Sequence, residues 1–167
     1  MTLTVGDRVA LGDLVARYAA YADGREFDEL ARLFTDDAVL LLPEPPRALE
    51  PVRSCRGRAE IKDALSALSA FPLTFHELAG AVHDPGGASG LATGRVAGVA
   101  HHLSERSPGT VTDLVWHVRY SDVYRRGRAG WRFARREVAV EWIETRPVRR
   151  WRPAAAGQRA PGPEVPP

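Results

Sequence analysis

The chain has 167 residues, enough for one domain around one hydrophobic core, which argues against a multidomain assembly. Hydrophobic residues make up 44% and charged residues 26%, a balance that argues against wholesale disorder, a collagen helix or a coiled coil. The formal net charge is +2, but residues 146–167 hold five arginines and one acid, so residues 1–145 carry −2 and offer no basic surface for nucleic acid.

We expect no secretory signal, because residues 1–6 lack a basic region followed by an apolar one. No apolar run approaches the roughly 20 residues that a membrane-spanning helix needs. The single cysteine, Cys55, excludes an internal disulfide framework and a cysteine-clustered zinc site. We therefore expect a cytoplasmic protein that has no contact with a membrane.

Residues 5–22 form the first periodic segment, in which apolar residues recur at spacings of three and four and predict an amphipathic helix. Asp23 and Gly24 end this helix, and residues 26–34 predict a second, short one. A turn at residues 35–37 leads into a buried strand over residues 38–42. Residues 43–57 contain four prolines, which cannot donate hydrogen bonds to a sheet, so we expect a loop or a lid there. A third helix is predicted over residues 58–70.

After residue 72 the apolar period changes to two and predicts strands over residues 73–82, 88–104, 110–126 and 131–145. The gaps between them are hairpin-sized, so successive strands are expected to pair antiparallel. The predicted helices lie mainly in the first half of the chain and the antiparallel meander in the second half. This order predicts an α+β fold, whose curled sheet leaves a concave space beside the helices. We expect residues 1–145 to form this domain and residues 146–167, rich in proline and arginine, to form a disordered tail.

Asp23 is the first candidate for chemistry because it lies at the C-terminal end of the first predicted helix. The helix dipole disfavours a carboxylate there, which tends to raise an aspartate pKa towards the range that suits a general acid or base. Asp-Gly is also an ordinary turn dipeptide, and the residues alone favour that interpretation.

Histidines are the next candidates, because imidazole exchanges protons near neutral pH. His76 lies in the first strand of the meander, although a lone strand histidine is more often structural. Only one of the adjacent His101 and His102 can face the concave side. Alternation counted from Gly94 selects His102, whereas counting from His76 selects His101, and we choose His102. The two adjacent side chains diverge, so we expect no metal site there.

The third strand of the meander has an aromatic face. Alternation places five residues on that face: Trp116, Val118, Tyr120, Asp122 and Tyr124. Such a face can line a pocket for a flat polycyclic substrate, or it can belong to ordinary core or dimer packing.

Several segments taken together resemble a known family. They are residues 18–38 (YAAYADGREFDELARLFTDDA), the GRAEI segment at 57–61, His76, the TGR segment at 93–95, the YSDVY segment at 120–124 and the GWRF segment at 130–133. Their order and spacing over residues 5–145 resemble the SnoaL-like branch of the nuclear transport factor 2-like superfamily. The resemblance implies a cone-shaped α+β barrel, with a curved antiparallel sheet wrapped around three N-terminal helices and one small-molecule pocket, usually in a homodimer. Its members include polyketide cyclases, scytalone dehydratase, a bile-acid dehydratase and relatives of ketosteroid isomerase.

The resemblance also implies roles for particular residues. In the family's dehydratases a histidine at the place of His76 pairs with the helix-end aspartate, here Asp23, and shuttles a proton. The matching tyrosine, Tyr18, lines the pocket as a hydroxyl donor, which we weigh evenly against a place in the core. A second catalytic histidine lies late in the next strand, at His102 or His101. The candidate substrate contacts are Trp116, Tyr120, Asp122, Tyr21 and Phe27.

One departure from the family pattern concerns the last strand. The bile-acid dehydratase pattern has an arginine where this sequence has Val140. This difference argues against the same anionic substrate.

We therefore predict a small-molecule lyase or isomerase, of the dehydratase or cyclase kind, that needs no cofactor and no metal and acts on a polyketide- or steroid-like substrate. In this hypothesis His76, oriented by Asp23, removes a proton next to a carbonyl, Tyr18 stabilises the oxyanion, and His102 or its neighbour returns a proton to the leaving hydroxyl. Two alternatives stay open: a cyclase that uses Asp23 alone, and a non-catalytic binding or assembly protein of the same fold. The expected partners are a small molecule and a second copy of the chain, with neither nucleic acid nor membrane.

Overall fold

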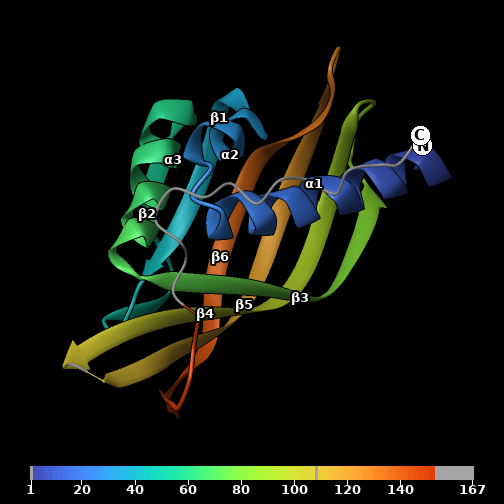
Figure 1. The fold of residues 1–167 in the computed structure, drawn as a ribbon. Helices are drawn as coiled ribbons and strands as arrows, with labels where there is room; N and C mark the ends of the chain where they lie inside the picture. The colour runs from blue at the N-terminus through green and yellow to red at the C-terminus, as the bar shows by residue number, and fades with distance from the viewer. Residues whose placement is uncertain (1, 108, 153–167) are drawn as a thin grey trace, which may run out of the picture.

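A computed structural model describes residues 2–107 and 109–152 and shows a curved sheet with helices against one of its faces (Figure 1). The helical elements are α1 (Val5–Asp23), α2 (Phe27–Arg32), α3 (Gly57–Ser66) and the short 3-10 helix η1 (Ala67–Ala70). The strands are β1 (Phe34–Glu44), β2 (Ala48–Arg56), β3 (Leu73–Pro85), β4 (Leu91–Ser107), β5 (Thr110–Gly127) and β6 (Gly130–Val148). The predicted cone-shaped α+β barrel is confirmed.

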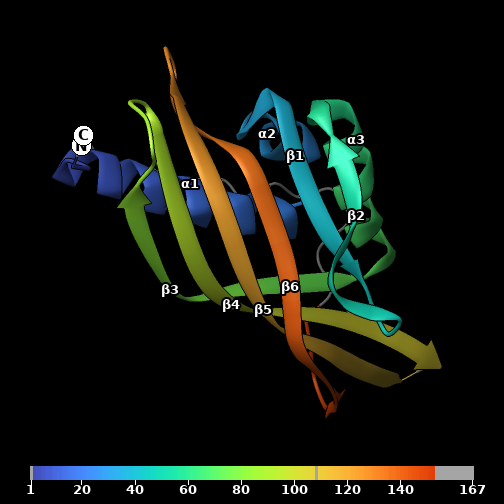
Figure 2. The same ribbon diagram turned by 180° about the vertical axis from the view of Figure 1, so that it is seen from behind.

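The six strands lie in the order β2-β1-β6-β5-β4-β3. The four strands from β3 to β6 form the predicted antiparallel meander, and β1 joins its far edge by pairing in parallel with β6. Helix α1 lies across the concave face of this sheet, as the two opposite views show (Figures 1 and 2). The C-terminal end of α1 therefore comes close to the beginning of β3, although the two are about fifty residues apart in sequence.

Helix α1 begins at a capping box, in which the Thr4 side chain accepts from the Asp7 backbone N–H and the Asp7 carboxylate accepts from the Thr4 backbone N–H. Its buried residues recur at helical spacing, among them Leu11, Leu14 and Tyr18, and they face the sheet. The helix ends at Asp23: Gly24 still donates to the Ala20 carbonyl, but the next residue, Arg25, has a φ of 59°, through which a right-handed helix cannot continue. This ending fixes Asp23 as the last helical residue.

The prediction of a loop or lid over residues 43–57 is wrong for most of that segment. Residues 48–56 form the strand β2, which pairs antiparallel with β1. Because β2 is the edge strand of the sheet, only one of its sides needs donors. Pro51 lies between the paired residues Ala48 and Arg53, in the stretch where the register shifts, so its missing N–H removes no pairing bond. The turn expected at residues 35–37 is also wrong, since β1 already begins at Phe34.

The last strand reaches further than predicted. β6 continues to Val148, three residues past the expected domain end at residue 145. The rest of the expected tail, residues 153–167, lies outside the described residues. Within the described ranges, no helix is long and apolar enough to cross a membrane.

Candidate active site

Asp23 and His76 meet where the end of α1 packs against β3. The His76 backbone N–H donates to Asp23 Oδ2 at 2.7 Å, and His76 Nδ1 lies 2.6 Å from Asp23 Oδ1. A carboxylate can only accept, so the imidazole carries its proton on Nδ1 and leaves the lone pair of Nε2 free. Only 10% of the His76 side chain is exposed. The structure thus brings together the two residues that the family resemblance paired.

Two further residues hold the Asp23 carboxylate, and sequence reasoning missed both. The Thr74 hydroxyl donates to Asp23 Oδ1 at 2.9 Å, and Arg25 Nη1 donates to the same hydroxyl oxygen at 2.6 Å. Because a guanidinium cannot accept, it fixes the direction of the chain: Arg25 donates to Thr74, and Thr74 donates to Asp23. Arg25 is itself held by the carbonyls of Ala22 and Phe71. The sequence could have identified Thr74, because alternation along the strand places it on the same face as His76.

The pKa of Asp23 corrects the expectation from the helix dipole. Burial of Asp23 raises its pKa, but the hydrogen bonds and charge of His76 and the Thr74 hydroxyl outweigh burial. The pKa of Asp23 therefore lies below its ordinary value of 3.8 instead of above it. At neutral pH Asp23 is a carboxylate that orients His76, and it has no proton to give.

His102 faces the interior of the cone, on the face of β4 that alternation from Gly94 selects. Its ring lies 6.0 Å from that of His76, 5.0 Å from that of Phe71 and 4.8 Å from that of Trp116, between centroids. His102 Nδ1 lies 3.2 Å from the Leu114 carbonyl oxygen and donates to it. Burial lowers the pKa of His102 to about 4, so its ring is neutral at neutral pH.

His101 points to the opposite, outer face of the sheet. Its Nδ1 lies 2.6 Å from Asp113 Oδ2, and its ring packs against that of Phe75, which is 57% exposed. This second Asp–His pair lies on the other side of β4 from Asp23 and His76.

Trp116 lies beside His102 on the interior face. It pairs in register with Ala100 of β4, which is buried, and its side chain packs against the core. Its indole Nε1 is fully buried and has no acceptor among the described residues. Trp116 is therefore a predicted substrate contact whose hydrogen-bonding group is buried and unused.

Three of the predicted site residues, Tyr18, Tyr120 and Asp122, lie together in the core around Arg136. Arg136 donates from Nε and Nη2 to the two carboxylate oxygens of Asp122 at 2.8 Å each, and 1% of the residue is exposed. Its guanidinium carbon lies 4.2 Å from the ring centroid of Tyr18 and 4.4 Å from that of Tyr120. Asp122 also accepts from the Tyr124 hydroxyl.

The contacts around Arg136 show how the predicted site residues next to it are used within the fold. The aromatic and cation–π contacts of Tyr18 join it to the core, and none of its described contacts is with Asp23 or His76. The sequence analysis missed Arg136, because nothing in the pattern of β6 shows that an arginine will meet Asp122. Since the pair is mutually neutralised, it leaves no free charge for a ligand.

The remaining two predicted contacts, Tyr21 and Phe27, are partly buried and pack against the outside of the core. The Tyr21 hydroxyl accepts from Arg17 Nη1 on the exposed side of α1. The structure does not bring either residue to His76 through a hydrogen bond or an aromatic contact within the described ranges.

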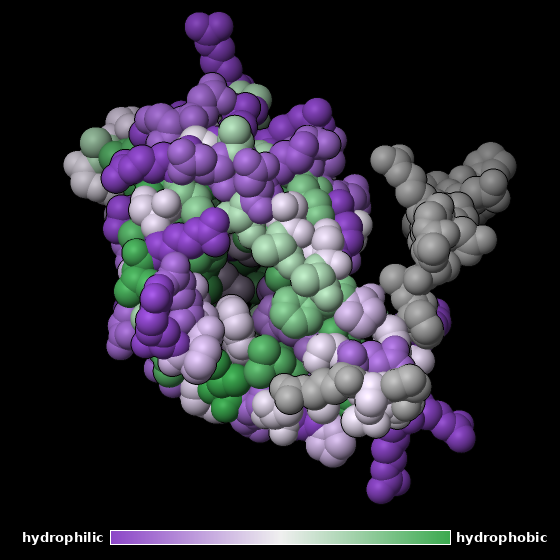
Figure 3. Space-filling model, turned by 90° about the vertical axis from the view of Figure 1, so that its left-hand side faces the viewer, coloured by the Kyte–Doolittle hydropathy of each residue, from purple (hydrophilic) through white to green (hydrophobic). Residues whose placement is uncertain are grey.

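The molecule is hollowed on the side where α3, β2 and the joined ends of β4 and β5 lie. Figure 3 shows a depression at the centre of this side, with apolar side chains beside and below it and hydrophilic ones above. The C-terminal end of α1 points to the same side (Figure 1).

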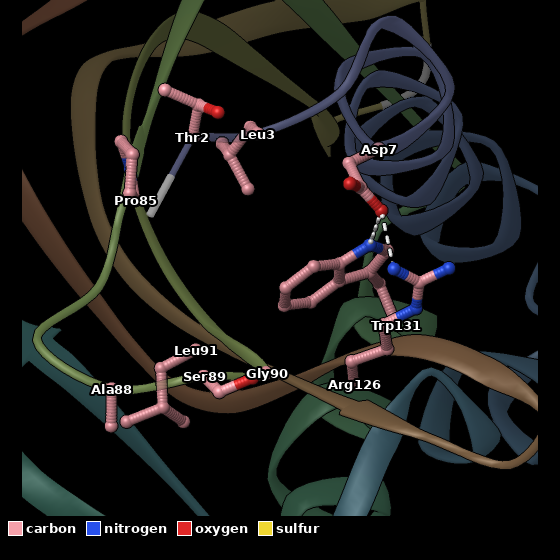
Figure 4. Close-up of a pocket in the computed structure, with 10 residues that line it drawn as sticks. All are labelled: Thr2, Leu3, Asp7, Pro85, Ala88, Ser89, Gly90, Leu91, Arg126 and Trp131. Atoms are coloured by element: carbon pink, nitrogen blue, oxygen red, sulfur yellow. Dashed lines mark hydrogen bonds and ion pairs between the residues drawn. The ribbon is translucent and has the colours of Figure 1, made fainter.

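A separate cavity of about 170 Å³ lies near the N-terminal end of α1 (Figure 4). Its polar centre is Asp7, whose carboxylate accepts from Trp131 Nε1 at 2.9 Å and pairs with Arg126 at 3.0 Å. With the hydrogen bonds from Thr4 added, this carboxylate is fully engaged by the protein.

Comparison with known proteins bears on the family and the fold. A family model described as the SnoaL-like domain matches residues 4–137. A structure of a candidate scytalone dehydratase from Novosphingobium aromaticivorans is 22% identical, with 94% of this chain and 97% of that chain covered and a TM-score of 0.71. A nuclear transport factor 2-like protein with a cystatin-like fold, from the same organism, is 26% identical, with coverages of 82% and 83% and a TM-score of 0.61. A hexachlorocyclohexane dehydrochlorinase is 16% identical, with coverages of 96% and 97% and a TM-score of 0.67. No curated protein matches the sequence.

Proposed function

The chain belongs to the SnoaL-like family, and from this premise we propose that it is a lyase that eliminates water from a small hydroxy-ketone without a cofactor. The observation that carries the proposal is the hydrogen-bonded pair of Asp23 and His76, held at the end of α1 and aimed by Thr74. The aromatic side chains of Phe71 and Trp116 around His102 fit a flat ring system, such as that of a polyketide- or steroid-like substrate.

In the proposed reaction, the lone pair of His76 Nε2 takes a proton from the carbon next to the substrate carbonyl. The electrons of that C–H bond are first held as an enolate, and they form a C=C bond when the C–O bond to the neighbouring hydroxyl breaks. The Asp23 carboxylate stabilises the imidazolium that forms on His76, through the 2.6 Å contact at Nδ1. The hydroxyl leaves as water after it receives a proton.

The proton for the leaving hydroxyl comes from His76 in this scheme, which changes the role first assigned to His102. Since the pKa of His102 is about 4, that ring is neutral at neutral pH, and its one N–H is bound to the Leu114 carbonyl. His76 has just become protonated by the first step and can return its proton to the leaving oxygen on the same side of the ring. The oxyanion role of Tyr18 and the predicted homodimer stay predictions.

The test uses 3-hydroxy-1-tetralone, because its dehydration gives 1-naphthol, which is followed by fluorescence. We expect His76→Gln and Asp23→Asn each to lower kcat by about 10²–10⁴-fold, the usual contribution of a positioned acid or base. The matched control is His101→Gln, which breaks the outer Asp–His pair and should leave the rate unchanged. Full activity of His76→Gln would overturn the mechanism. Binding of the tetralone without turnover by the wild-type protein would favour a non-catalytic binding protein.

A further inference from the structure

The buried indole nitrogen of Trp116 is a donor that the protein leaves without an acceptor. Nε1 is fully buried, on the interior face of β5, and no acceptor reaches it within residues 2–107 and 109–152. Burying an unpaired donor is costly, and native proteins rarely keep one without a functional reason. The proposed elimination makes no use of this group.

The neighbouring His102 supplies the complementary acceptor. Because Nδ1–H donates to the Leu114 carbonyl, the lone pair of Nε2 is available, and Nε2 makes no hydrogen bond to the described part of the chain. The low pKa of His102, about 4, keeps this lone pair free over the physiological range. A donor and an acceptor thus lie side by side on adjacent strands.

The two rings that carry these groups lie next to each other, with their planes tilted by 52°. The ring centroids of His102 and Trp116 are 4.8 Å apart. One oxygen can bridge two nitrogen atoms up to about 6 Å apart, since each hydrogen bond spans about 3 Å. A hydroxyl satisfies both groups at once, because its oxygen accepts from Trp116 while its proton goes to His102. A carbonyl oxygen or a carboxylate would instead set its own lone pairs against that of His102.

The charges around the site also disfavour a charged ligand group. Asp23 is engaged by His76 and Thr74, Arg25 by Thr74 and two backbone carbonyls, and Arg136 by Asp122. These pairings leave the surroundings of His102 and Trp116 aromatic and without a free counter-ion among these residues.

We infer that Trp116 Nε1 and His102 Nε2 form a subsite for the hydroxyl group of an uncharged aromatic or polycyclic substrate. Trp116 donates to the hydroxyl oxygen, and His102 accepts the hydroxyl proton. The inference rests on the proposed function in one respect: it assigns this hydroxyl to the same substrate from which His76 removes a proton. The subsite therefore selects a ring that carries a hydroxyl beyond the one that is eliminated.

The test measures binding, not turnover, with 2-naphthol, 2-methoxynaphthalene and naphthalene as probes. The methyl ether can accept from Trp116 but cannot donate to His102, and naphthalene can do neither. By isothermal titration calorimetry we expect 2-naphthol to bind the wild-type protein about tenfold more tightly than the ether, the ratio that corresponds to one lost hydrogen bond. Trp116→Phe, which keeps an aromatic ring, should weaken 2-naphthol binding about tenfold and leave naphthalene binding nearly unchanged.

The matched control is Trp142→Phe, because Trp142 is 51% exposed and pairs with His117 on the outer face. It should leave the affinities for all three probes unchanged. In the wild-type NMR spectrum, the indole N–H signal that Trp116→Phe removes should move downfield with 2-naphthol more than with naphthalene. Equal affinities for the three probes, no binding of 2-naphthol, or an unmoved indole signal would each overturn the subsite. Tetralone turnover that depends on His76 would still support the proposed lyase in that case, so the two failures are distinguishable.

Discussion

At the scale of single residues, the chemistry depends on how the Asp23 carboxylate is held. Oδ1 accepts from both the Thr74 hydroxyl and the His76 ring, while Oδ2 accepts from the His76 backbone N–H. Three donors on one carboxylate fix its orientation and favour its charged form. The arrangement gives His76 one tautomer, with the reactive Nε2 free to meet a substrate.

Thr74→Val tests this arrangement, because valine keeps the shape of threonine and removes the hydroxyl. We expect the pKa of Asp23 to rise relative to the wild-type protein, and kcat to fall about tenfold, the effect of one lost hydrogen bond. Carboxyl ¹³C NMR titration and tetralone kinetics measure the two effects. Thr112→Val is the control, since Thr112 bonds Ser104 instead of Asp23. An unmoved Asp23 titration would show that the hydroxyl does not act on the carboxylate.

The same carboxylate gives folding a pH dependence whose sign is fixed. The pKa of Asp23 in the folded state lies below that of the unfolded chain, so ionised Asp23 stabilises the fold above about pH 4. This contribution is lost as the pH falls through the folded-state pKa. Urea unfolding between pH 6 and pH 3 should therefore show a smaller loss of stability in Asp23→Asn than in the wild-type protein. Equal losses in the two proteins would contradict this account.

At the scale of elements, the interior face of β4 is shaped by glycines as much as by side chains. Gly98 pairs with Leu78 next to the bulge of β3, and a Cβ on Gly98 would lie 2.6 Å from the Glu77 carbonyl oxygen. β3 can approach this closely only because residue 98 has no side chain. The approach fixes β3 one residue away from His76, so the strand pairing also positions the catalytic pair.

Gly98→Ala should therefore destabilise the protein by about 1–3 kcal/mol, the usual cost of forcing an extra carbon into a packed interior. The matched control is Gly80→Ala in the neighbouring strand, where a Cβ meets nothing within 4 Å and the stability should hold or rise slightly. Urea denaturation measures both variants. Equal stability of the two variants would mean that β3 shifts freely.

At the scale of the whole molecule, a buried ion pair occupies the middle of the core. Arg136 of β6 and Asp122 of β5 are about 1% and 3% exposed and are surrounded by Tyr18, Tyr120 and Phe133. The rings, the carboxylate and the Tyr124 hydroxyl replace the water that the charges lose. Loss of one partner leaves the other charge buried and unpaired, which is more costly than loss of both.

Arg136→Met should accordingly cost about 3–5 kcal/mol of folding free energy. Adding Asp122→Asn to Arg136→Met should recover a large part of this cost, because asparagine carries no charge and still accepts from the Tyr124 hydroxyl. Urea denaturation of the single and double variants measures the difference. A double variant that is less stable than Arg136→Met would show that the cost does not come from the buried, unpaired charge of Asp122.

The sequence predicted much of the fold, because its signals were local. Helical spacing located α1, period-two alternation and short glycine turns located the meander, and alternation from Gly94 turned His102 inwards. The strand β2 escaped prediction because its prolines are read locally as loop residues. Their tolerance depends on its place at the edge of the sheet, which no local pattern contains.

The sequence by itself determined that an aspartate ends the first helix and that histidines lie on the strands beyond it. Only the tertiary structure decided how these groups behave. It gave Asp23 three donors and so lowered its pKa, against the expectation from the helix dipole, and it joined Arg25 and Thr74 to the pair. It also paired Arg136 with Asp122 and left the Trp116 indole without an acceptor. The physical reason is that protonation and hydrogen bonding depend on neighbours distant in the chain, which only the packing of α1 against the curved sheet brings together.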